Sequence, residues 1–469
     1  MIGTRSIAAP GSALPAAVGL AAAVGWLLVA PGFAVAMVIA LAPGVLALWL
    51  QPRGREIAVG LALGAVPVIS GVAAATASSG AAVRRIDDVV LLLGLIALAT
   101  QWRLFPERFR RPALAAGAVL VASEIAGLSA GWDSPLVTLG AAWQDLRWLG
   151  AIGVGLALGN RLTSADCRRA SLALLTAWSG LNLAVSLVQI VGRTLDEQRF
   201  GLPVVSGAFG HPTFGAMAGT CLFLYVAADR LSPRRRLGDP AAFALAMLAL
   251  ANLVISVRFK ALLSIGAALV FLLLQGRHRR KPLVAAAFAV VPLFVVPLIG
   301  LTQQLSAGAA PGQQTFLADT ASHAAPRLSL MAGAKRLASE NFPFGSGLGT
   351  FGSNLDPKLE NVTFNEAGIG DLYGLSAHDS AFRSDSQVAH TLAERGYLGV
   401  ALWMLGLSLV LVAAVRLPGA SLYPGTALVA AISAAAVSPS LISGPAIYIF
   451  LLPAGFELAA GLRDPPERR

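Results

Sequence analysis

Apolar segments follow one another along most of this chain, with short polar connections between them. Each is close to the roughly 20 residues that an α-helix needs to cross the hydrocarbon core of a bilayer. The expected spans are 12–30, 32–50, 56–75, 88–102, 112–130, 142–160, 170–191, 210–229, 240–257, 260–276, 283–302, 396–415, 423–437 and 441–460. The pattern therefore predicts an all-α integral membrane protein with about 12–14 transmembrane helices.

This alternation is interrupted once. We expect residues 303–394 to form one long polar loop carrying short helices, between an N-terminal helix bundle (1–302) and C-terminal helices (395–469) of the same polytopic domain. Residues 327–337 are apolar on one helical face, which predicts a short amphipathic helix lying along the membrane surface. Because the other connections are short, this loop is where aqueous chemistry is expected.

Composition and charge agree with a membrane protein. Hydrophobic residues make up 56% of the chain and charged residues 13%, and the mean hydropathy is +0.72. Most of the 35 Lys and Arg residues flank alternate connections, which places both termini in the cytoplasm and the 303–394 loop outside, in the periplasm of a bacterium. The net charge of +11 thus follows from topology and does not indicate nucleic-acid binding.

The N-terminal segment and the cysteines add little chemistry. The first apolar segment has no clear cleavage site, so we expect it to remain as a helix of the inner membrane rather than to act as a cleaved signal peptide. Cys167 and Cys221 are too far apart in the sequence to indicate a disulfide framework or a metal-binding pair.

Two arginines lie near expected outer helix ends. Arg147, in the sequence WQDLRW, stands at the outer start of the 142–160 span, and Arg258 lies in a connection too short to leave the membrane boundary. An Arg held there is costly unless it faces a water-filled cavity or an anion, so both are candidates for binding an anionic substrate. For Arg147, a simple interfacial position beside Asp145 is an equally good explanation.

A third arginine, Arg199, precedes the sequence GAFGHPT at the mouth of the 210–229 span. It is a further candidate for anion binding. His211 stands beside Pro212 there, and capping of the helix entrance would explain it without any catalytic role.

Two motifs in the polar loop contain groups suited to binding and proton transfer. Three glycines between Gly345 and Gly349 predict a turn whose backbone can approach a ligand, although the Lys and the preceding strand of a nucleotide-binding loop are missing. Farther on, residues 378–390 contain two His, two Asp and one Arg. Such groups can transfer protons and bind anions, and a solvated polar loop could have the same composition. Their spacing matches no strong metal-ligand pattern, so no metal or other cofactor is expected.

Several of these segments occur in a recognisable order. They are Gly207–Thr213 with a helix behind it, Ser256–Arg258, Arg327, Pro343–Phe351, Asp385–Ser386 and the Glu394-x-Gly396-x-x-Gly399 re-entry into the membrane. In order and topology they resemble the O-antigen ligase and O-antigen polymerase superfamily. The resemblance extends over about residues 195–415 and does not depend on one diagnostic string.

The resemblance implies a glycosyltransferase that acts at the periplasmic face without a metal ion or a nucleotide sugar. Its donor would be a glycan on undecaprenyl diphosphate. Its acceptor would be lipid A core in a ligase, or another lipid-linked repeat unit in a polymerase. Membrane lipids, a flippase and a chain-length regulator are further expected partners.

One departure from the ligase pattern affects the choice between these activities. Ligases resemble one another in a His-Asn pair nine residues before the re-entry Glu, and here Asp385-Ser386 occupies that register. His378, seven residues farther upstream, could supply an imidazole only after a loop rearrangement. We therefore favour a surface-polysaccharide polymerase, for O-antigen or exopolysaccharide, with the ligase as the alternative.

The chemistry of transfer assigns expected roles to these residues. Cleavage of the sugar–phosphate bond leaves a diphosphate, which the planar, permanently charged guanidinium group neutralises well. Arg147 and Arg258 are the first expected diphosphate ligands, and Arg199 and Arg327 are second contacts. Asp385 or His378 is expected to remove the proton of the acceptor hydroxyl.

Two other classes of protein stay open at this point. A lipid-linked glycan flippase or transporter would also have many helices and internal arginines. It should show repeat symmetry and broken central helices, and it would need no long outer loop. A non-catalytic scaffold of a polysaccharide assembly complex would tolerate substitution of the arginines.

Overall fold

The computed structural model describes most of the chain from Ile86 to Asp464. The segments between these residues that it does not describe are 129–133, 193–197, 200–201, 204, 206, 210, 233–234, 257, 278–313, 354, 381, 417–420, 437 and 439–443. Four expected spans, 12–30, 32–50, 56–75 and 283–302, lie outside the described residues.

Helices dominate the described residues, whose strands are two short antiparallel segments, β1 (Gln198–Arg199) and β2 (Leu202–Pro203). The first helices are α5 (Ile86–Gln101), η1 (Trp102–Leu104), α6 (Glu107–Leu128), α7 (Pro135–Leu146), α8 (Trp148–Gly159) and α9 (Ser164–Val191). The middle ones are η2 (Gly207–Phe209), α10 (Pro212–Leu231), α11 (Asp239–Ser256) and α12 (Phe259–Arg277). The last are α14 (Gln314–Glu340), α15 (Pro357–Glu366), α16 (Gln387–Arg416), α17 (Tyr423–Ala435) and α18 (Gly444–Arg463).

The described helices confirm an all-α, multi-pass membrane protein. Six of them, α6, α9, α10, α11, α16 and α18, are long and apolar enough to cross a membrane, and α8, α12 and α17 are shorter apolar helices. Nine of the ten expected spans that fall on described residues each overlap a single α-helix. One expectation was wrong in detail: the 142–160 span is divided at Arg147, and its apolar part, α8, begins at Trp148.

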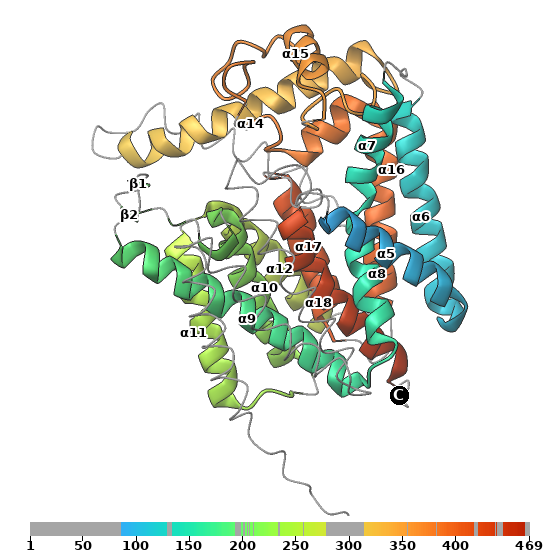
Figure 1. The fold of residues 1–469 in the computed structure, drawn as a ribbon, viewed down its shortest axis with the longest axis vertical. Coiled ribbons are helices and arrows are strands. Elements are labelled where there is room, and N and C mark those ends of the chain that lie inside the picture. The colour runs from blue at the N-terminus through green and yellow to red at the C-terminus, as the bar shows by residue number, and fades with distance from the viewer. Residues whose placement is uncertain are drawn as a thin grey trace, which may run out of the picture.

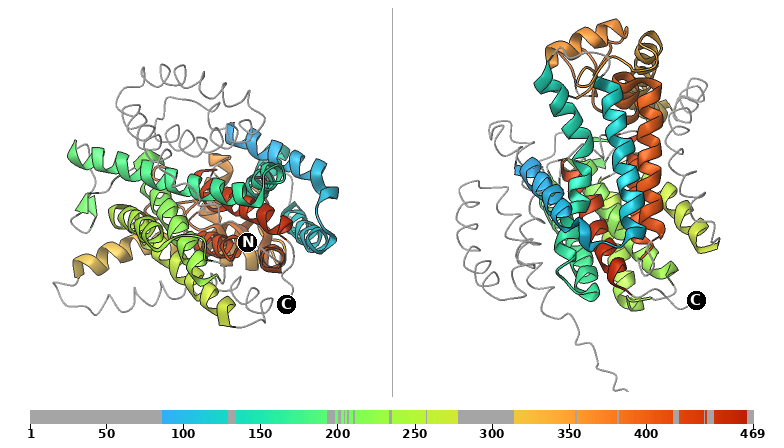
Figure 2. Two further views of the ribbon diagram at one scale, coloured as in Figure 1. Left: turned by 90° about the horizontal axis from the view of Figure 1, so that it is seen from below. Right: turned by 90° about the vertical axis from the view of Figure 1, so that its right-hand side faces the viewer.

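The helices pack around α18 and α17, which lie at the centre of the bundle (Figures 1 and 2). Small residues allow close approach: a Cβ atom built on Gly155 of α8 would lie only 2.8 Å from the Cα atom of Gly455 in α18. Helices α6 and α16 run side by side along the same flank (Figure 2).

The polar region folds into a cap over one end of this bundle (Figure 1). We use the name cap for α14, α15 and the described residues that connect them to α16. The cap has its own hydrophobic core, in which Leu330 and Leu337 of α14 join Phe351, Phe364 and Leu375. The 27-residue α14 is thus much longer than the amphipathic helix expected at 327–337, because that helix continues towards its N-terminus.

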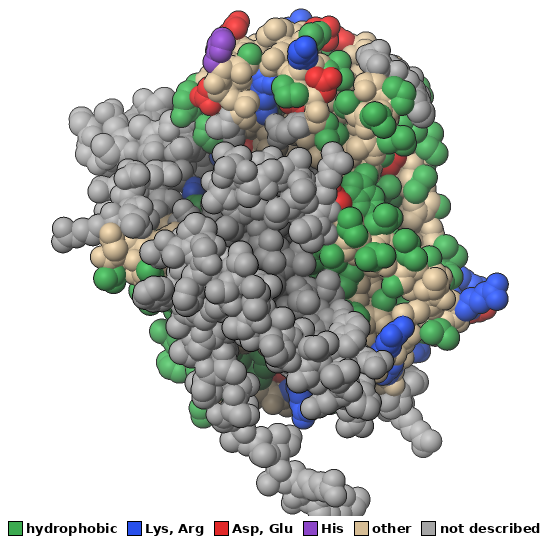
Figure 3. All heavy atoms as spheres, in the orientation of Figure 1, with side chains coloured by type: hydrophobic (Ala, Val, Ile, Leu, Met, Phe, Trp, Pro, Cys, Tyr) green, Lys and Arg blue, Asp and Glu red, His purple; other side chains and the backbone are tan. Residues whose placement is uncertain are grey.

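The apolar face of α14 is buried inside the protein. Leu330 and Ala334 are fully buried, whereas Lys335 and Arg336 are exposed. Helix α14 packs against α16, so its apolar side chains contact the cap core where the sequence had suggested contact with lipid. Figure 3 shows the matching surface: charged side chains gather on the cap and at the opposite end, and hydrophobic side chains cover the flank between them.

Candidate functional site

Helix α16 begins in the cap and continues into the membrane-spanning bundle, and it bends at Gly396, which has φ 63° and ψ −167°. The glycine-rich segment wraps around this bend. Ser346 N donates to Ala393 O at 2.8 Å, Gly347 N donates to Glu394 O at 3.0 Å, and Leu398 N donates to Pro343 O at 3.3 Å. The glycine-rich backbone, expected to approach a ligand, therefore approaches α16.

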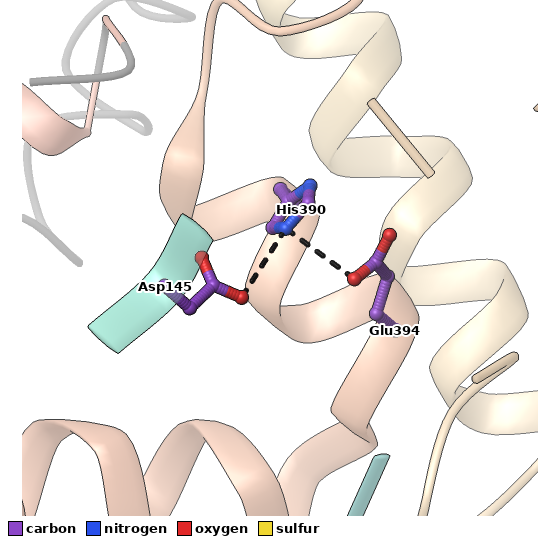
Figure 4. A group of neighbouring side chains, drawn as sticks. All are labelled: Asp145, His390 and Glu394. Atoms are coloured by element: carbon purple, nitrogen blue, oxygen red, sulfur yellow. Dashed lines mark ion pairs between the residues drawn. The ribbon is translucent and has the colours of Figure 1, made fainter. Parts of the chain in front are cut away.

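Two side chains of α16 hold the peptide groups of Phe351. The Phe351 N–H donates to Glu394 Oε1 at 2.8 Å, and His390 Nδ1 lies 2.6 Å from Phe351 O. Because a carbonyl oxygen can only accept, Nδ1 carries the proton. His390 Nε2 then points towards two carboxylates, 3.3 Å from Glu394 Oε2 and 3.6 Å from Asp145 Oδ2 (Figure 4). A proton must lie on Nε2 or on a carboxylate for this arrangement to be favourable.

Arg395, the next residue on α16, connects the same group to α6 and α7. Its guanidinium contacts Asp145 Oδ2 and lies 3.0 Å from Glu124 Oε1, and its Nη1 donates to Ser123 Oγ at 3.4 Å. These charged side chains are all buried. We call Glu124, Asp145, His390, Glu394 and Arg395 the buried ion cluster. Removing one partner of such a cluster leaves an uncompensated charge, so the cluster fixes α6, α7 and α16 relative to one another.

The geometry of the cluster could also accommodate a metal ion. One ligand atom each from Asp145, His390 and Glu394 lies within 4.8 Å of the others. The Nδ1–H of His390 donates to a backbone carbonyl, as is usual for metal-bound histidines. However, Arg395 already places a positive charge on Asp145 Oδ2, so the ion pairs account for the arrangement.

Two of the residues singled out in the sequence meet in the structure. Arg327 of α14 forms an ion pair with Asp385, which lies two residues before the start of α16. Their side chains are 15% and 16% exposed, so the pair is sheltered but reachable from solvent. The other expected proton acceptor, His378, is exposed to solvent in the loop that precedes Asp385.

The other candidate arginines belong to other segments of the chain. Arg147 Nη1 lies 3.0 Å from Asp88 Oδ1 of α5, and Trp143 Nε1 donates to the same oxygen at 2.9 Å. Asp145, suggested as the neighbour of Arg147, instead belongs to the buried ion cluster, because α7 ends between them and turns the two side chains to different elements.

Arg258 lies in the turn between α11 and α12, as expected, and is partly buried. Arg199 is in β1, and its side chain lies outside the described part of the protein. The capping role of His211 is confirmed: its Nδ1 accepts from Thr213 N at 3.2 Å at the start of α10.

The buried ion cluster was missed in the sequence. Glu124 stands inside an apolar span, and an ionisable residue at such a place is a signal of a buried partner or a function. His390 and Glu394 were read as parts of the polar loop and Arg395 as the first residue of the C-terminal helices, because the helical start of α16 before the apolar run was not anticipated.

A comparison with protein families identifies the segment that contains much of this site. Residues 243–404 match the family described as O-antigen ligase. This match supports the resemblance to the O-antigen ligase/polymerase superfamily that the sequence motifs indicate. No significant match was found among curated proteins or among solved structures.

The O-antigen ligase segment extends from α11 to the first half of α16. It includes Arg258, Arg327, Asp385 and the α16 residues of the buried ion cluster, whereas Arg147 and the cluster members on α6 and α7 precede it. The O-antigen ligase family supports a membrane enzyme of glycosyltransferase type with lipid-linked glycan and acceptor substrates.

Proposed function

We propose that the protein is a glycosyltransferase at the periplasmic face of the bacterial inner membrane, where it polymerises a surface polysaccharide from repeat units on undecaprenyl diphosphate. The observation that carries this proposal is the Arg327–Asp385 ion pair, which joins a cation to a carboxylate inside the O-antigen ligase segment. The topology supports it, because the described connections α8–α9 and α10–α11, which contain Arg161 and Arg235–Arg236, lie at the end of the bundle opposite the cap (Figure 1).

The proposed reaction uses both members of the pair. The acceptor hydroxyl attacks the anomeric carbon of the donor glycan, and the bond from that carbon to the phosphate oxygen breaks. The electron pair of that bond leaves with undecaprenyl diphosphate, whose negative charge Arg327 stabilises by a charge-assisted hydrogen bond. Once Arg327 has turned to the diphosphate, Asp385 accepts the proton of the hydroxyl. Arg147, Arg258 and Arg199 are the further proposed diphosphate ligands.

The buried ion cluster supports this site through α16. Asp385 lies two residues before the helix, and His390 and Glu394 fix the first turns of α16 to Phe351 in the cap. Correct placement of reacting groups can contribute several orders of magnitude to a rate. The cluster is therefore proposed to position Asp385 without touching the substrate.

Substitution of the proposed site tests the function in cells that lack the chromosomal copy of the gene. Asp385→Asn, Arg258→Ala and Arg258→Lys should abolish polymer while normal amounts of protein reach the membrane, and loss of a general base typically costs about 10²–10⁴-fold in rate. Arg336→Ala, at an exposed position of α14, is the matched control and should retain normal polymer. Normal polymer from Asp385→Asn would remove this residue from the mechanism.

The deletion strain itself distinguishes polymerase from ligase. Loss of a polymerase should leave lipid A core bearing a single repeat unit. Bare core together with retained lipid-linked polymer would instead identify a ligase, the alternative activity. Both patterns are read from the ladder of extracted glycans on a gel.

A further inference from the structure

The loop that leads to Asp385 is fixed by hydrogen bonds and by a buried anchor. Gly374 N donates to Asp379 Oδ2 at 3.1 Å, and Phe382 N donates to Gly374 O at 2.9 Å, so the loop closes on itself. Asp385 N in turn donates to Phe382 O at 3.0 Å. Arg383, between them, is 3% exposed and donates from Nε to the carbonyl of the same loop, Leu375 O, at 2.9 Å.

Arg383 anchors this loop to α15. Its guanidinium lies 4.7 Å from the centre of the Phe364 ring and 3.9 Å from Glu360 Oε2. Burial lowers the pKa of Arg383, and the charge of Glu360 opposes this change. Because the anchor is inside the cap core, the residues on either side of it are held in place.

The loop carries two neighbouring aromatic rings: Tyr373 is exposed on the outer surface of the cap, and Phe382 is partly buried and packs against the cap core. The rings of Tyr373 and Phe382 have centroids 5.9 Å apart and planes at 58°, and Tyr373 is 70% exposed. Phe382 lies directly on Gly374, where φ is 74° and an added Cβ atom would be 2.1 Å from the ring. The cap core does not need Tyr373, since so much of the residue remains in water.

We propose that Tyr373 and Phe382 form a binding subsite for a sugar ring of the acceptor glycan. This inference rests on the proposed function, because the Phe382 carbonyl is hydrogen-bonded to the amide of Asp385, the proposed proton acceptor. A pyranose has a face of C–H groups that packs on an aromatic ring, and its hydroxyl groups bind polar side chains at the edge. The exposed Asp371 and His378, in the same loop, supply such polar groups.

The neighbouring chemistry favours a sugar over other ligands. A lipid chain would require a continuous apolar surface, whereas the exposed part of this loop also carries the acidic and imidazole side chains of Asp371 and His378. A diphosphate would require cations, and Arg383 is buried beneath the loop. The subsite is assigned to the acceptor because its hydroxyl must reach Asp385, while the diphosphate of the donor binds arginines.

Direct binding of an oligosaccharide tests the subsite. The probe is an oligosaccharide released by partial hydrolysis from the surface polysaccharide of the source strain, added to the purified full-length protein in detergent. Saturation-transfer NMR reports which sugar C–H protons contact the protein. Tyr373→Ala should weaken binding by about tenfold, the effect of about 1.4 kcal/mol. Tyr373→Phe, which keeps the ring, should bind as the unmodified protein does.

Two further variants make the outcome decisive. Val362→Ala removes another exposed apolar side chain, 55% exposed on α15, and should leave binding unchanged. Equal binding by Tyr373→Ala and the unmodified protein would overturn the subsite, as would an equal loss in Val362→Ala. Asp385→Asn separates the two proposals: it should lose transfer and keep oligosaccharide binding. If it keeps transfer, the proposed mechanism fails, whatever the NMR result at Tyr373.

Discussion

The bend of α16 offers a sharp test of how the glycine-rich segment is held, through the substitution Gly396→Ala. Gly396 has φ 63° and ψ −167°, a region that is essentially restricted to glycine. An added Cβ atom would lie 2.2 Å from Pro343 O and 2.6 Å from Gly345 N. These are backbone atoms, so the glycine-rich segment would have to move away from α16.

The cost follows from two contributions. The strained backbone conformation costs about 1–3 kcal/mol for a residue other than glycine. Movement of the segment also weakens the three backbone hydrogen bonds that it makes to α16 around the bend, at about 1 kcal/mol each. Gly396→Ala should therefore destabilise the protein by about 4–6 kcal/mol, a loss that few single substitutions reach.

Thermal unfolding of the purified protein in detergent measures this effect. The control is Gly117→Ala in α6, where nothing lies within 4 Å of the added Cβ atom. Alanine is favoured over glycine in a helix by about 0.5–1 kcal/mol, so the control should melt at the same temperature as the unmodified protein or slightly higher. If Gly396→Ala and Gly117→Ala have the same melting temperature, the glycine-rich segment does not constrain the bend.

Two further substitutions test the interactions that hold the site. Arg395→Ala leaves Glu124 and Asp145 without their buried partner and should cost about 3–5 kcal/mol in unfolding free energy, whereas Arg336→Ala, in an exposed pair, should cost less than about 1 kcal/mol. Equal melting temperatures of these two variants would contradict the structural role of the buried ion cluster. Asp356 is the N-cap residue of α15, and its carboxylate accepts hydrogen bonds from two backbone N–H groups. Asp356→Ala removes these bonds and should lower the unfolding free energy by about 1 kcal/mol, and Asp356→Ser should restore most of this stability. Identical melting temperatures of the Asp356→Ala and Asp356→Ser variants would show that the N-cap side chain contributes nothing to stability.

The sequence predicted the membrane part of the fold well because apolar length is a local property. Any segment such as 240–257 must satisfy its backbone hydrogen bonds within itself in a bilayer, and a helix does so without help from other segments. The turn at Arg258 and the N-cap role of His211 could likewise be predicted, because each depends on neighbouring residues in the sequence.

The polar region was predicted less completely. The sequence of residues 303–394 lacks long apolar runs, so it was expected to be a loop with short helices, whereas α14 and α15 enclose a small core there. Arg327 and Asp385 are 58 residues apart in the sequence and meet only because the intervening residues fold back on themselves. Nothing in the sequence near either residue specifies that the two side chains meet.

By itself, the sequence determined an all-α membrane protein whose motifs resemble the O-antigen ligase/polymerase superfamily, because hydrophobic length and the order of short motifs can be read residue by residue. Only the tertiary structure decided which charges meet. Asp145 joins Arg395, although the two residues are 250 positions apart in the sequence, and Arg147, two residues from Asp145, faces Asp88 instead. A buried charge is stable only beside its partners, and the packing of α6, α7 and α16 determines where those partners lie.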